Sequence, residues 1–509
     1  MQGPIGFIPF LALFGMLAFT RIPAYLATLT TMLGTCVLAS GVWHAPTSAL
    51  THAAGEGAVT AFLPILWVIF AAIFVYFVST ETGAMDVIRN MLCRACPDIR
   101  IQAVLIAFCF GGFLEAVAGF GTAVAIPTAM LITLGCNPVA AATVALVANS
   151  VPVAFGALGI PVITLAKVTE LDVSTLTRHI ALQLALFAVV VPVALAKLAD
   201  RSRPLAGWVV RDALLIGVVF SATQVAVAFV AGPELVAVLA SLFSLVLFLV
   251  IQQWRNPEAK GLFTLALLRA TLPFLILLVL VLATRLISIP VLQKAPFTFT
   301  TNAFSTTTPP HPLKLDIATT PGTLLLLAGL IGGLIQGLHP ARLGALLWKT
   351  AKTVKWTSVT IVSILILAKV MTVSGMIASV AVQIAHVSGS MFPIIAPMLG
   401  ALGTFVTGSD TSSNILLGEL QKQTAISTGF DPAWVTAANT TGATAGKMIS
   451  PQSIAIACST VGIESCQREI FRKTIVYCAL YVIAVGLLVW LGALTHIPQA
   501  WTPHSLPMH

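Results

Sequence analysis

Charged residues are what this sequence has least of. Only 8% of its 509 residues are Asp, Glu, Lys or Arg, whereas 58% are hydrophobic, and the mean hydropathy is +1.01. Soluble domains carry about 25% charged residues, so this composition excludes a soluble globular protein. Apolar runs of roughly 20 residues, the length that crosses a hydrocarbon core, recur along the chain. The sequence therefore predicts an all-α polytopic membrane protein in contact with lipid.

The motifs of enzymes and metal sites are also missing. The nine histidines are scattered, and the chain contains neither an HExxH zinc motif nor a GxxxxGK[ST] phosphate loop. Cys93 and Cys96 form a lone CxxC with no His or Cys nearby to complete a zinc site. We therefore expect no enzyme activity, no bound metal and no cofactor. A membrane enzyme, such as a hydrolase using Ser412, is the least favoured alternative.

The basic residues gather between the apolar spans. The net charge of +9 would suit a nucleic-acid partner in a soluble protein, but most Lys and Arg residues here occupy five short connections. Basic connections face the cytoplasm in membrane proteins, so we expect no nucleic-acid partner. The five connections are 81–100, 201–211, 255–269, 342–355 and 468–473.

The apolar spans alternate between these cytoplasmic connections and others with little charge. This alternation predicts a multi-pass membrane protein with both termini outside and an external Thr/Pro-rich loop at 289–320. The uncharged connections 43–58 and 383–390 are also expected outside. About 12 transmembrane helices are predicted, at 5–20, 23–42, 59–80, 101–117, 178–199, 208–230, 234–253, 263–288, 321–337, 356–382, 390–406 and 474–495.

Two regions, 119–161 and 408–451, mix apolar segments with Gly, Pro, Asn, Ser and Thr. Irregular backbone at membrane depth is tolerated only where it is buried in protein or lines a wet cavity. Both regions are therefore predicted to be broken helices or re-entrant hairpins. Each starts with a Gly-x-x-Thr motif and later has an Asn twelve residues before a Pro.

The charge pattern predicts that the two regions enter the membrane from opposite sides. The first follows the basic connection 81–100, whereas the second follows the uncharged connection 383–390. Such a pair is typical of an inverted repeat, with a first unit at 1–230 and a second at 231–509. Inverted repeats place a ligand near the midplane, where the N-termini of half-helices favour an anion.

Four strings in these regions resemble the lactate permease family of secondary transporters. They are FLEAVAGFGTAVAI at 113–126, ALVANSVPVAFGALGIP at 145–161, GSDTSSNILLGELQ at 408–421 and AANTTGATAGKMISPQSIAIA at 437–457. The resemblance implies a symporter of the cell inner membrane that imports lactate, glycolate and related 2-hydroxy monocarboxylates with protons. A sodium-coupled carboxylate carrier is the closest alternative, and a passive channel follows. The sequence does not decide between a monomer and a homodimer.

Ionisable residues at membrane depth suggest function because they are costly there. Glu115 and Asp410 are candidate proton carriers, with structural roles as the alternative; for Asp410 that role is an N-cap. Lys447 is expected to bind the substrate carboxylate or to pair with Asp410. Arg285 is a candidate substrate ligand that could instead extend toward the membrane surface.

Two further charged residues have other expected surroundings. Lys369 needs a partner or a wet cavity, and it is a weaker candidate for the substrate than Arg285. Glu419, beside Gln421 and Lys422, is predicted at a surface hairpin tip.

Neutral residues of the two regions complete the candidate site. Their side chains could bind a carboxylate and a hydroxyl, although each could instead satisfy helix backbone. The candidates are Thr122, Asn149, Ser150, Thr411, Ser412, Ser413, Asn414, Asn439 and Thr440. Five glycines are expected to let the backbone approach the ligand, or else to allow close helix packing. They are Gly119, Gly121, Gly408, Gly442 and Gly446.

Overall fold

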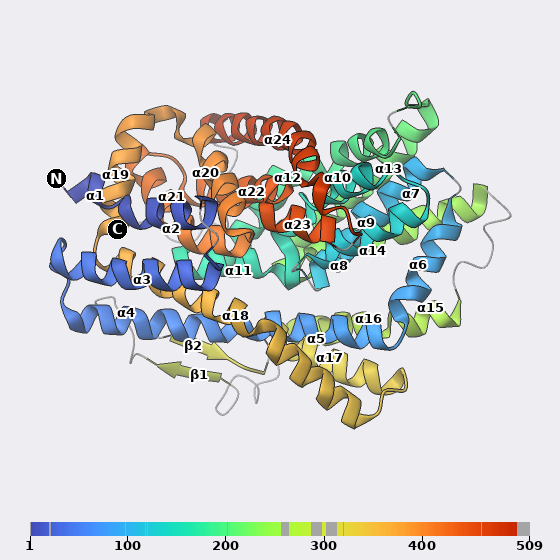
Figure 1. Ribbon diagram of the computed structural model, residues 1–509, viewed down its shortest axis with the longest axis horizontal. Coiled ribbons are helices and arrows are strands. Elements are labelled where there is room, and N and C mark those ends of the chain that lie inside the picture. Colours follow the sequence, from blue (N-terminus) through green and yellow to red (C-terminus); the bar gives the residue numbers. More distant parts are fainter. Residues whose placement is uncertain are drawn as a thin grey trace.

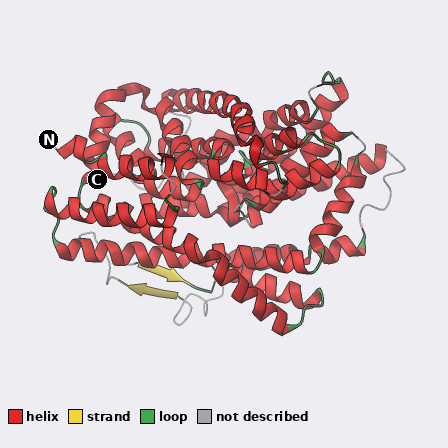
Figure 2. Cartoon of the chain, viewed as in Figure 1, coloured by secondary structure: helices red, strands yellow, loops and turns green. Residues whose placement is uncertain are grey.

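The computed structural model of the chain is almost entirely helical (Figure 2). One exception is an antiparallel pair of short strands, β1 (Thr298–Thr301) and β2 (Leu313–Asp316), which lies within the predicted external loop 289–320. The all-α prediction is confirmed apart from this pair. The structure describes residues 2–19, 22–96, 98–117, 119, 121–200, 202–255, 264–286, 298–301, 313–318, 320–459 and 461–495.

One layer of the molecule, in the lower part of Figure 1, holds helices from two parts of the chain, residues 24–81 and 272–373. Within it α18 contacts α3, α4 and α5, and α17 contacts α5 and α16. The layer consists of α3 (Ala24–Gly41), α4 (Thr47–Thr60), the π-helical segment η1 (Ala61–Leu66), α5 (Trp67–Glu81), α16 (Leu272–Leu286), α17 (Pro321–Ile335) and α18 (Pro340–Val373).

The other body, in the upper part of Figure 1, contains both regions that were predicted to be interrupted. Three long helices, α12, α13 and α14, pack side by side, and α12 also contacts α22 (Pro432–Ile449). The remaining bounds outside the interrupted regions are α1 (Gln2–Ile5), α2 (Ile8–Phe19), α6 (Ala84–Ala95), α12 (Val173–Ala199), α13 (Gly207–Val230), α14 (Pro233–Arg255), α15 (Leu265–Ala270), α19 (Met376–Ser388), η6 (Gly389–Met391), η7 (Glu464–Cys466) and α24 (Gln467–Thr495).

Besides the turn at residues 134–137, the first region is interrupted twice. Helix ends at Val117, and Gly119 and Gly121 adopt left-handed φ angles of 58° and 86° before helix resumes at Thr122. A second break follows Asn149, where Ala157, Leu158 and Gly159 are left-handed inside α11. Only glycine adopts this conformation without strain. The elements are α7 (Ile99–Ala103), η2 (Val104–Phe110), α8 (Gly111–Val117), α9 (Thr122–Thr133), α10 (Pro138–Ala148), η3 (Pro152–Phe155) and α11 (Gly156–Thr169).

Besides the turn at residues 429–431, the second region is also interrupted twice. Gly408, with a φ of 73°, separates α20 (Phe392–Thr407) from α21 (Asp410–Thr428), and Ser450 separates α22 (Pro432–Ile449) from α23 (Pro451–Ser459). Proline is favoured in a first helical turn because its missing N–H would be unpaired there anyway. Accordingly, Pro451 opens the helix after its break, and Pro161 closely follows the left-handed stretch of α11. The prediction of two broken-helix regions is confirmed.

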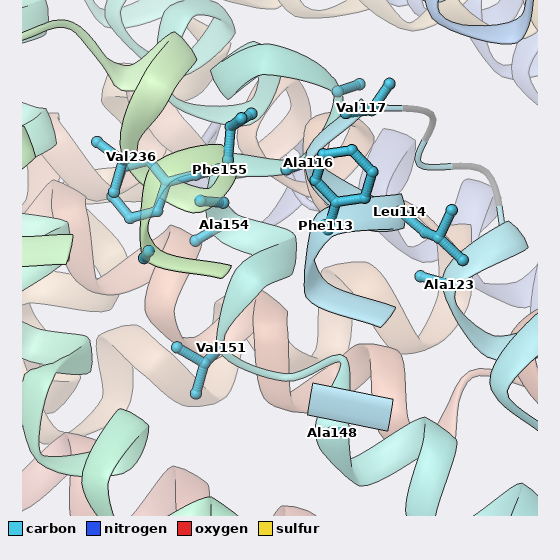
Figure 3. Packing of buried hydrophobic residues seen from close by; sticks show 14 of the residues in the cluster. Phe113, Leu114, Ala116, Val117, Ala123, Ala148, Val151, Ala154, Phe155 and Val236 are labelled. Atoms are coloured by element: carbon cyan, nitrogen blue, oxygen red, sulfur yellow. The ribbon is translucent and has the colours of Figure 1, made fainter. Parts of the chain in front are cut away.

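Buried apolar side chains hold the first interruption in place. Figure 3 shows Phe113 and Leu114 of α8 near Ala123 of α9, and Phe155 next to Val236; all five belong to one cluster of buried apolar residues. The ring of Phe113 also meets that of Phe274 edge-on, with centroids 4.6 Å apart. Because these side chains are almost fully buried, the break is part of a packed core rather than a surface loop.

Several predicted helix bounds were wrong. The predicted helix 59–80 begins instead at Thr47, so most of the expected outer loop 43–58 is helical. The predicted helix 356–382 is divided at Gly375, whose φ is 81°, and α19 then fills most of the expected loop 383–390. The predicted helix 263–288 is split into α15 and α16. Within the described residues, nine helical stretches are long and apolar enough to span a membrane, so the count of 12 is not confirmed.

Candidate functional site

The two interrupted regions meet at one cavity of about 350 Å³. Its wall comes from both regions and from α3, α5 and α18 of the other layer. The lining residues are Tyr25, Ile69, Glu115, Gly119, Gly121, Val153, Gly156, Ala157, Ile160, Pro161, Trp356, Thr357, Thr360, Ile361, Thr407, Gly408, Ser409, Asp410, Thr411, Ser412, Lys447, Gln452, Ser453 and Ile456.

Four helix N-termini converge on this cavity. Gly121 precedes α9, the stretch 160–161 opens the regular part of α11, the stretch 409–412 opens α21, and the stretch 452–453 lies in the first turn of α23. The first N–H groups of a helix have no partner within the helix, and the helix dipole is positive at that end. The four termini therefore make this cavity suited to an anion.

The sequence explains why α21 begins where it does. Ser409 has an extended backbone, and its Oγ accepts a hydrogen bond from the main-chain N of Ser412 at 3.3 Å. Ser409 is thus the N-cap of α21, and the N-cap role considered for Asp410 was wrong. Asp410 is the first helical residue, where a carboxylate is favoured by the dipole.

Lys447 and Glu115 join the two regions by a buried ion pair. Lys447 Nζ lies 3.3 Å from Glu115 Oε1, and both side chains line the cavity. Lys447 thus contacts Glu115 rather than Asp410, which had been the expected partner. The second oxygen of Glu115, Oε2, is buried and accepts no hydrogen bond from the residues that the structure describes.

Asp410 is the other acid of the cavity. It is 2% exposed, and neither of its carboxylate oxygens has a hydrogen-bond partner in the described part of the chain. A buried carboxylate without a partner is costly. This environment suits a group that takes up a proton or contacts a ligand.

Three expected neutral ligands do not line the cavity and bind one another instead. Asn414 Oδ1 accepts hydrogen bonds from Asn439 Nδ2 at 2.8 Å and from Thr440 Oγ1 at 3.0 Å. Asn414 Nδ2 in turn donates to the carbonyl of Pro161 at 3.0 Å, and Gln421 Nε2 donates to Asn439 Oδ1 at 2.7 Å. All of these amide and hydroxyl side chains are fully buried. They connect α11, α21 and α22 and have little capacity left for a substrate.

Other expected ligands are likewise buried away from the cavity. Ser413 Oγ donates to the carbonyl of Gly400, and Ser150 Oγ donates to that of Val147. Asn149 ends α10, and its buried side chain has no hydrogen-bond partner among the described residues. Of the neutral candidates, Thr411 and Ser412 do line the cavity.

The five glycines fall into two groups. Gly119, Gly121 and Gly408 line the cavity and have left-handed φ angles, so the backbone does approach the cavity there. Gly442 and Gly446 instead face α20, where an added Cβ would overlap the main chain of Pro397 and Ala401. For these two the ligand-approach prediction was wrong, because they serve close packing of α22 on α20.

The remaining charged candidates have other surroundings. Lys369 Nζ lies 2.6 Å from Glu56 Oε1 of α4, so it pairs outside the cavity. Glu419 lies within α21, is 6% exposed and accepts a hydrogen bond from Gln423. The prediction that it lies at a surface hairpin tip was therefore wrong. Thr122 opens α9 and Arg285 lies in α16, but both side chains fall outside the described part.

Sequence reasoning missed several residues of the cavity wall. They are Tyr25, Trp356, Thr357, Thr360, Gln452 and Ser453. One signal was available for α18, because Thr357 and Thr360 are three apart and therefore share one face of the helix. A second signal was available for Gln452, because it follows Pro451 at the start of a half-helix.

Solved structures share the fold. The YdaH transporter of Alcanivorax borkumensis is 14% identical and superposes with a TM-score of 0.50, covering 87% of this chain and 88% of that one. MtrF of Neisseria gonorrhoeae is 12% identical with a TM-score of 0.51, covering 95% and 98%. At these identities the likeness shows the fold alone, which is that of membrane transporters.

Sequence relatives are closer. Residues 5–495 match the family model of the L-lactate permease. The L-lactate permease of Streptococcus iniae is 38% identical over 444 residues, which is 86% of this chain and 93% of that one. Glycolate permease GlcA of Escherichia coli (strain K12) is 33% identical over 539 residues, covering 96% and 95%. With nine membrane-length apolar stretches in its described part, the chain is a multi-pass membrane protein and belongs to the L-lactate permease family.

Proposed function

We propose that this chain imports lactate, glycolate and related 2-hydroxy monocarboxylates across the cell inner membrane in symport with protons, without covalent chemistry. The names of its relatives, L-lactate permease and glycolate permease, support this class of substrate. The observation that carries the proposal is the convergence of four helix N-termini and Lys447 on one cavity. A carboxylate placed there would accept main-chain hydrogen bonds and face a cation.

Recognition of the substrate is assigned to the residues that line the cavity. Thr411 and Ser412 belong to the first turn of α21 and present hydroxyl groups, while the main-chain N of Ser412 donates to Ser409 Oγ. Lys447 is held by Glu115 at 3.3 Å, so the arriving carboxylate competes with Glu115 for the ammonium group. Release from Lys447 would leave the Glu115 carboxylate without its ion-pair partner and available to a proton. Substrate binding and proton binding are coupled in this scheme.

Glu115 and Asp410 both remain candidates for the proton-carrying group. Both carboxylates line the cavity, and each has at least one buried oxygen without a partner in the described part of the chain. Replacement of the carrier by its amide abolishes gradient-driven accumulation but preserves exchange of internal for external lactate, since exchange needs no net proton movement. Accumulation and exchange are measured for both Glu115→Gln and Asp410→Asn. The variant that loses accumulation but keeps exchange identifies the proton-carrying residue. Loss of exchange in both variants would instead mean that each residue is needed for binding.

The orientation in the membrane is part of the proposal. The two broken regions would enter from opposite sides as units 1–230 and 231–509, with both termini external. Support comes from the positive-inside pattern and from the matching interruptions before Pro161 and Pro451. We expect a cysteine that replaces Gln2 to react only with a thiol reagent added on the outer side. Labelling only from the cytoplasmic side would contradict it.

Sodium coupling is the second candidate, because Asn149 favours it. Its buried amide lies at a helix break and has no partner among the described residues, and unwound backbone beside such groups can coordinate Na⁺. Uptake of labelled lactate into proteoliposomes distinguishes the two. An inward proton gradient alone should drive accumulation. Accumulation driven only by sodium would select the second candidate, and accumulation under neither gradient would refute both.

A further inference from the structure

The cavity has two unlike walls. The wall formed by the interrupted regions carries the helix N-termini and Lys447. The other wall comes from the lower layer of Figure 1, chiefly from α18, with single residues of α3 and α5. This α18 wall has no charged side chain, and its one residue from a helix end is Tyr25, in the first turn of α3. It consists of Tyr25, Ile69, Trp356, Thr357, Thr360 and Ile361.

Packing fixes part of the α18 wall in place, although Trp356 itself is half exposed. Trp356 stacks on Tyr25 with ring centroids 4.3 Å apart and an angle of 23° between the planes. Ile69 and Ile361 are 2% and 5% exposed, so their positions are set by the surrounding core. Thr360 Oγ1 donates to the carbonyl of Trp356 at 3.1 Å. A wall held in this way can discriminate between ligands by size.

A 2-hydroxy acid bound by its carboxylate at the helix N-termini would direct the substituent on its second carbon toward the α18 wall. That substituent is hydrogen in glycolate and methyl in lactate. Water occupies roughly 30 Å³ per molecule, so a cavity of about 350 Å³ has room for about a dozen groups of that size. Lactate has about half as many non-hydrogen atoms as the cavity has room for, so space is left between its methyl group and this wall.

We propose that the α18 wall is the subsite for the substituent on the second carbon, and that the protein also binds 2-hydroxy monocarboxylates with longer or branched alkyl substituents. The proposal rests on the proposed function, since it places the carboxylate at the helix N-termini. Thr360 and Ile361 are the residues that set the permitted length. Their size, rather than the anion-binding wall, decides which members of the series fit.

Equilibrium binding to the purified protein tests this subsite. Calorimetric titration would use glycolate, lactate, 2-hydroxybutyrate and 2-hydroxy-4-methylpentanoate with the wild-type chain and with Thr360→Leu. One methylene against an apolar wall changes binding by roughly tenfold or more. We therefore expect Thr360→Leu to weaken binding of the branched acid by at least about tenfold, relative to glycolate. Ile361→Ala should act in the opposite direction and favour the branched acid.

Thr353→Leu is the matched control, because Thr353 lies on the exposed face of the same helix and does not line the cavity. It should leave the order of affinities unchanged. Equal effects of Thr360→Leu on glycolate and on the branched acid would overturn the subsite, as would failure of the wild type to bind the branched acid. If the wild type binds neither the branched acid nor lactate, the proposed function itself is refuted. If it binds lactate but not the branched acid, only the subsite is refuted.

Discussion

Asn414 of α21 donates a hydrogen bond to the main-chain carbonyl of Pro161 in α11, with 3.0 Å between Nδ2 and O. This contact ties the start of one half-helix to the start of another, and both starts line the same cavity. The orientation of the amide is fixed because its oxygen accepts from Asn439 and Thr440. Asn414 therefore positions the helix N-termini, although the sequence had suggested a direct substrate ligand.

Replacing Asn414 by Leu should destabilise the protein. The change leaves the Pro161 carbonyl and the donors of Asn439 and Thr440 without their partner, and each buried unpaired group costs about 1–3 kcal/mol. Thermal unfolding in detergent should shift to lower temperature. Ser427→Ala on the exposed face of the same helix is the control. An unchanged midpoint for Asn414→Leu would argue against the network.

The Lys447–Glu115 pair should behave as a unit. Breaking one half of a buried pair costs about 3–5 kcal/mol because it leaves an uncompensated charge. Lys447→Met and Glu115→Gln should each lower stability, whereas the double variant should recover much of that loss. Lactate binding should stay weak in the double variant, because the cation is still missing. Additive losses of stability would mean that the two residues are not coupled.

Gly442→Ala should prevent assembly of the second interrupted region. A Cβ at this position would overlap the main chain of Pro397 in α20, and a backbone atom cannot move aside as a flexible side chain can. We expect a loss of monodisperse protein after purification. Gly344→Ala, with open space around its position in α18, is the control and should be neutral or stabilising by up to about 1 kcal/mol. Normal yield of Gly442→Ala would refute the close approach of α22 and α20.

Asp98 should make stability depend on pH. Hydrogen bonds from Arg100 lower the pKa of the Asp98 carboxyl, which also caps α7. A carboxyl whose pKa is lower in the folded than in the unfolded chain stabilises the fold above the unfolded pKa, and that contribution is lost as the pH falls through the folded pKa. Asp98→Asn should therefore melt below the wild type at neutral pH, with the difference closing in acid. A difference that is independent of pH would contradict this role.

The sequence predicted the interruptions because Gly, Pro and Asn are conspicuous in apolar spans. It also identified Glu115, Asp410 and Lys447, since charge at membrane depth is rare, and all three line the cavity. It could not assign partners. Lys369 pairs with Glu56, which lies 313 residues earlier in the chain. Distances of this kind depend on tertiary packing rather than on local pattern.

Buried polar residues were harder to interpret than charged ones. An Asn within a membrane protein either contacts a ligand or satisfies another buried group, and its neighbours in sequence do not distinguish the two. Asn414 and Asn439 satisfy each other, because Asn439 of α22 donates a hydrogen bond to Asn414 of α21. The α18 wall was missed for a related reason, since its threonines resemble ordinary residues of a membrane helix that bond back to their own backbone.

The central claim is that helix N-termini and Lys447 bind the negative charge of the substrate in this cavity. The most direct measurement compares calorimetric binding of lactate with that of lactamide, which keeps the shape and the hydroxyl group but has no charge. Charge-assisted hydrogen bonds are roughly twice as strong as neutral ones, so we expect lactate to bind at least about tenfold more tightly. Equal affinity for the two compounds would contradict the account.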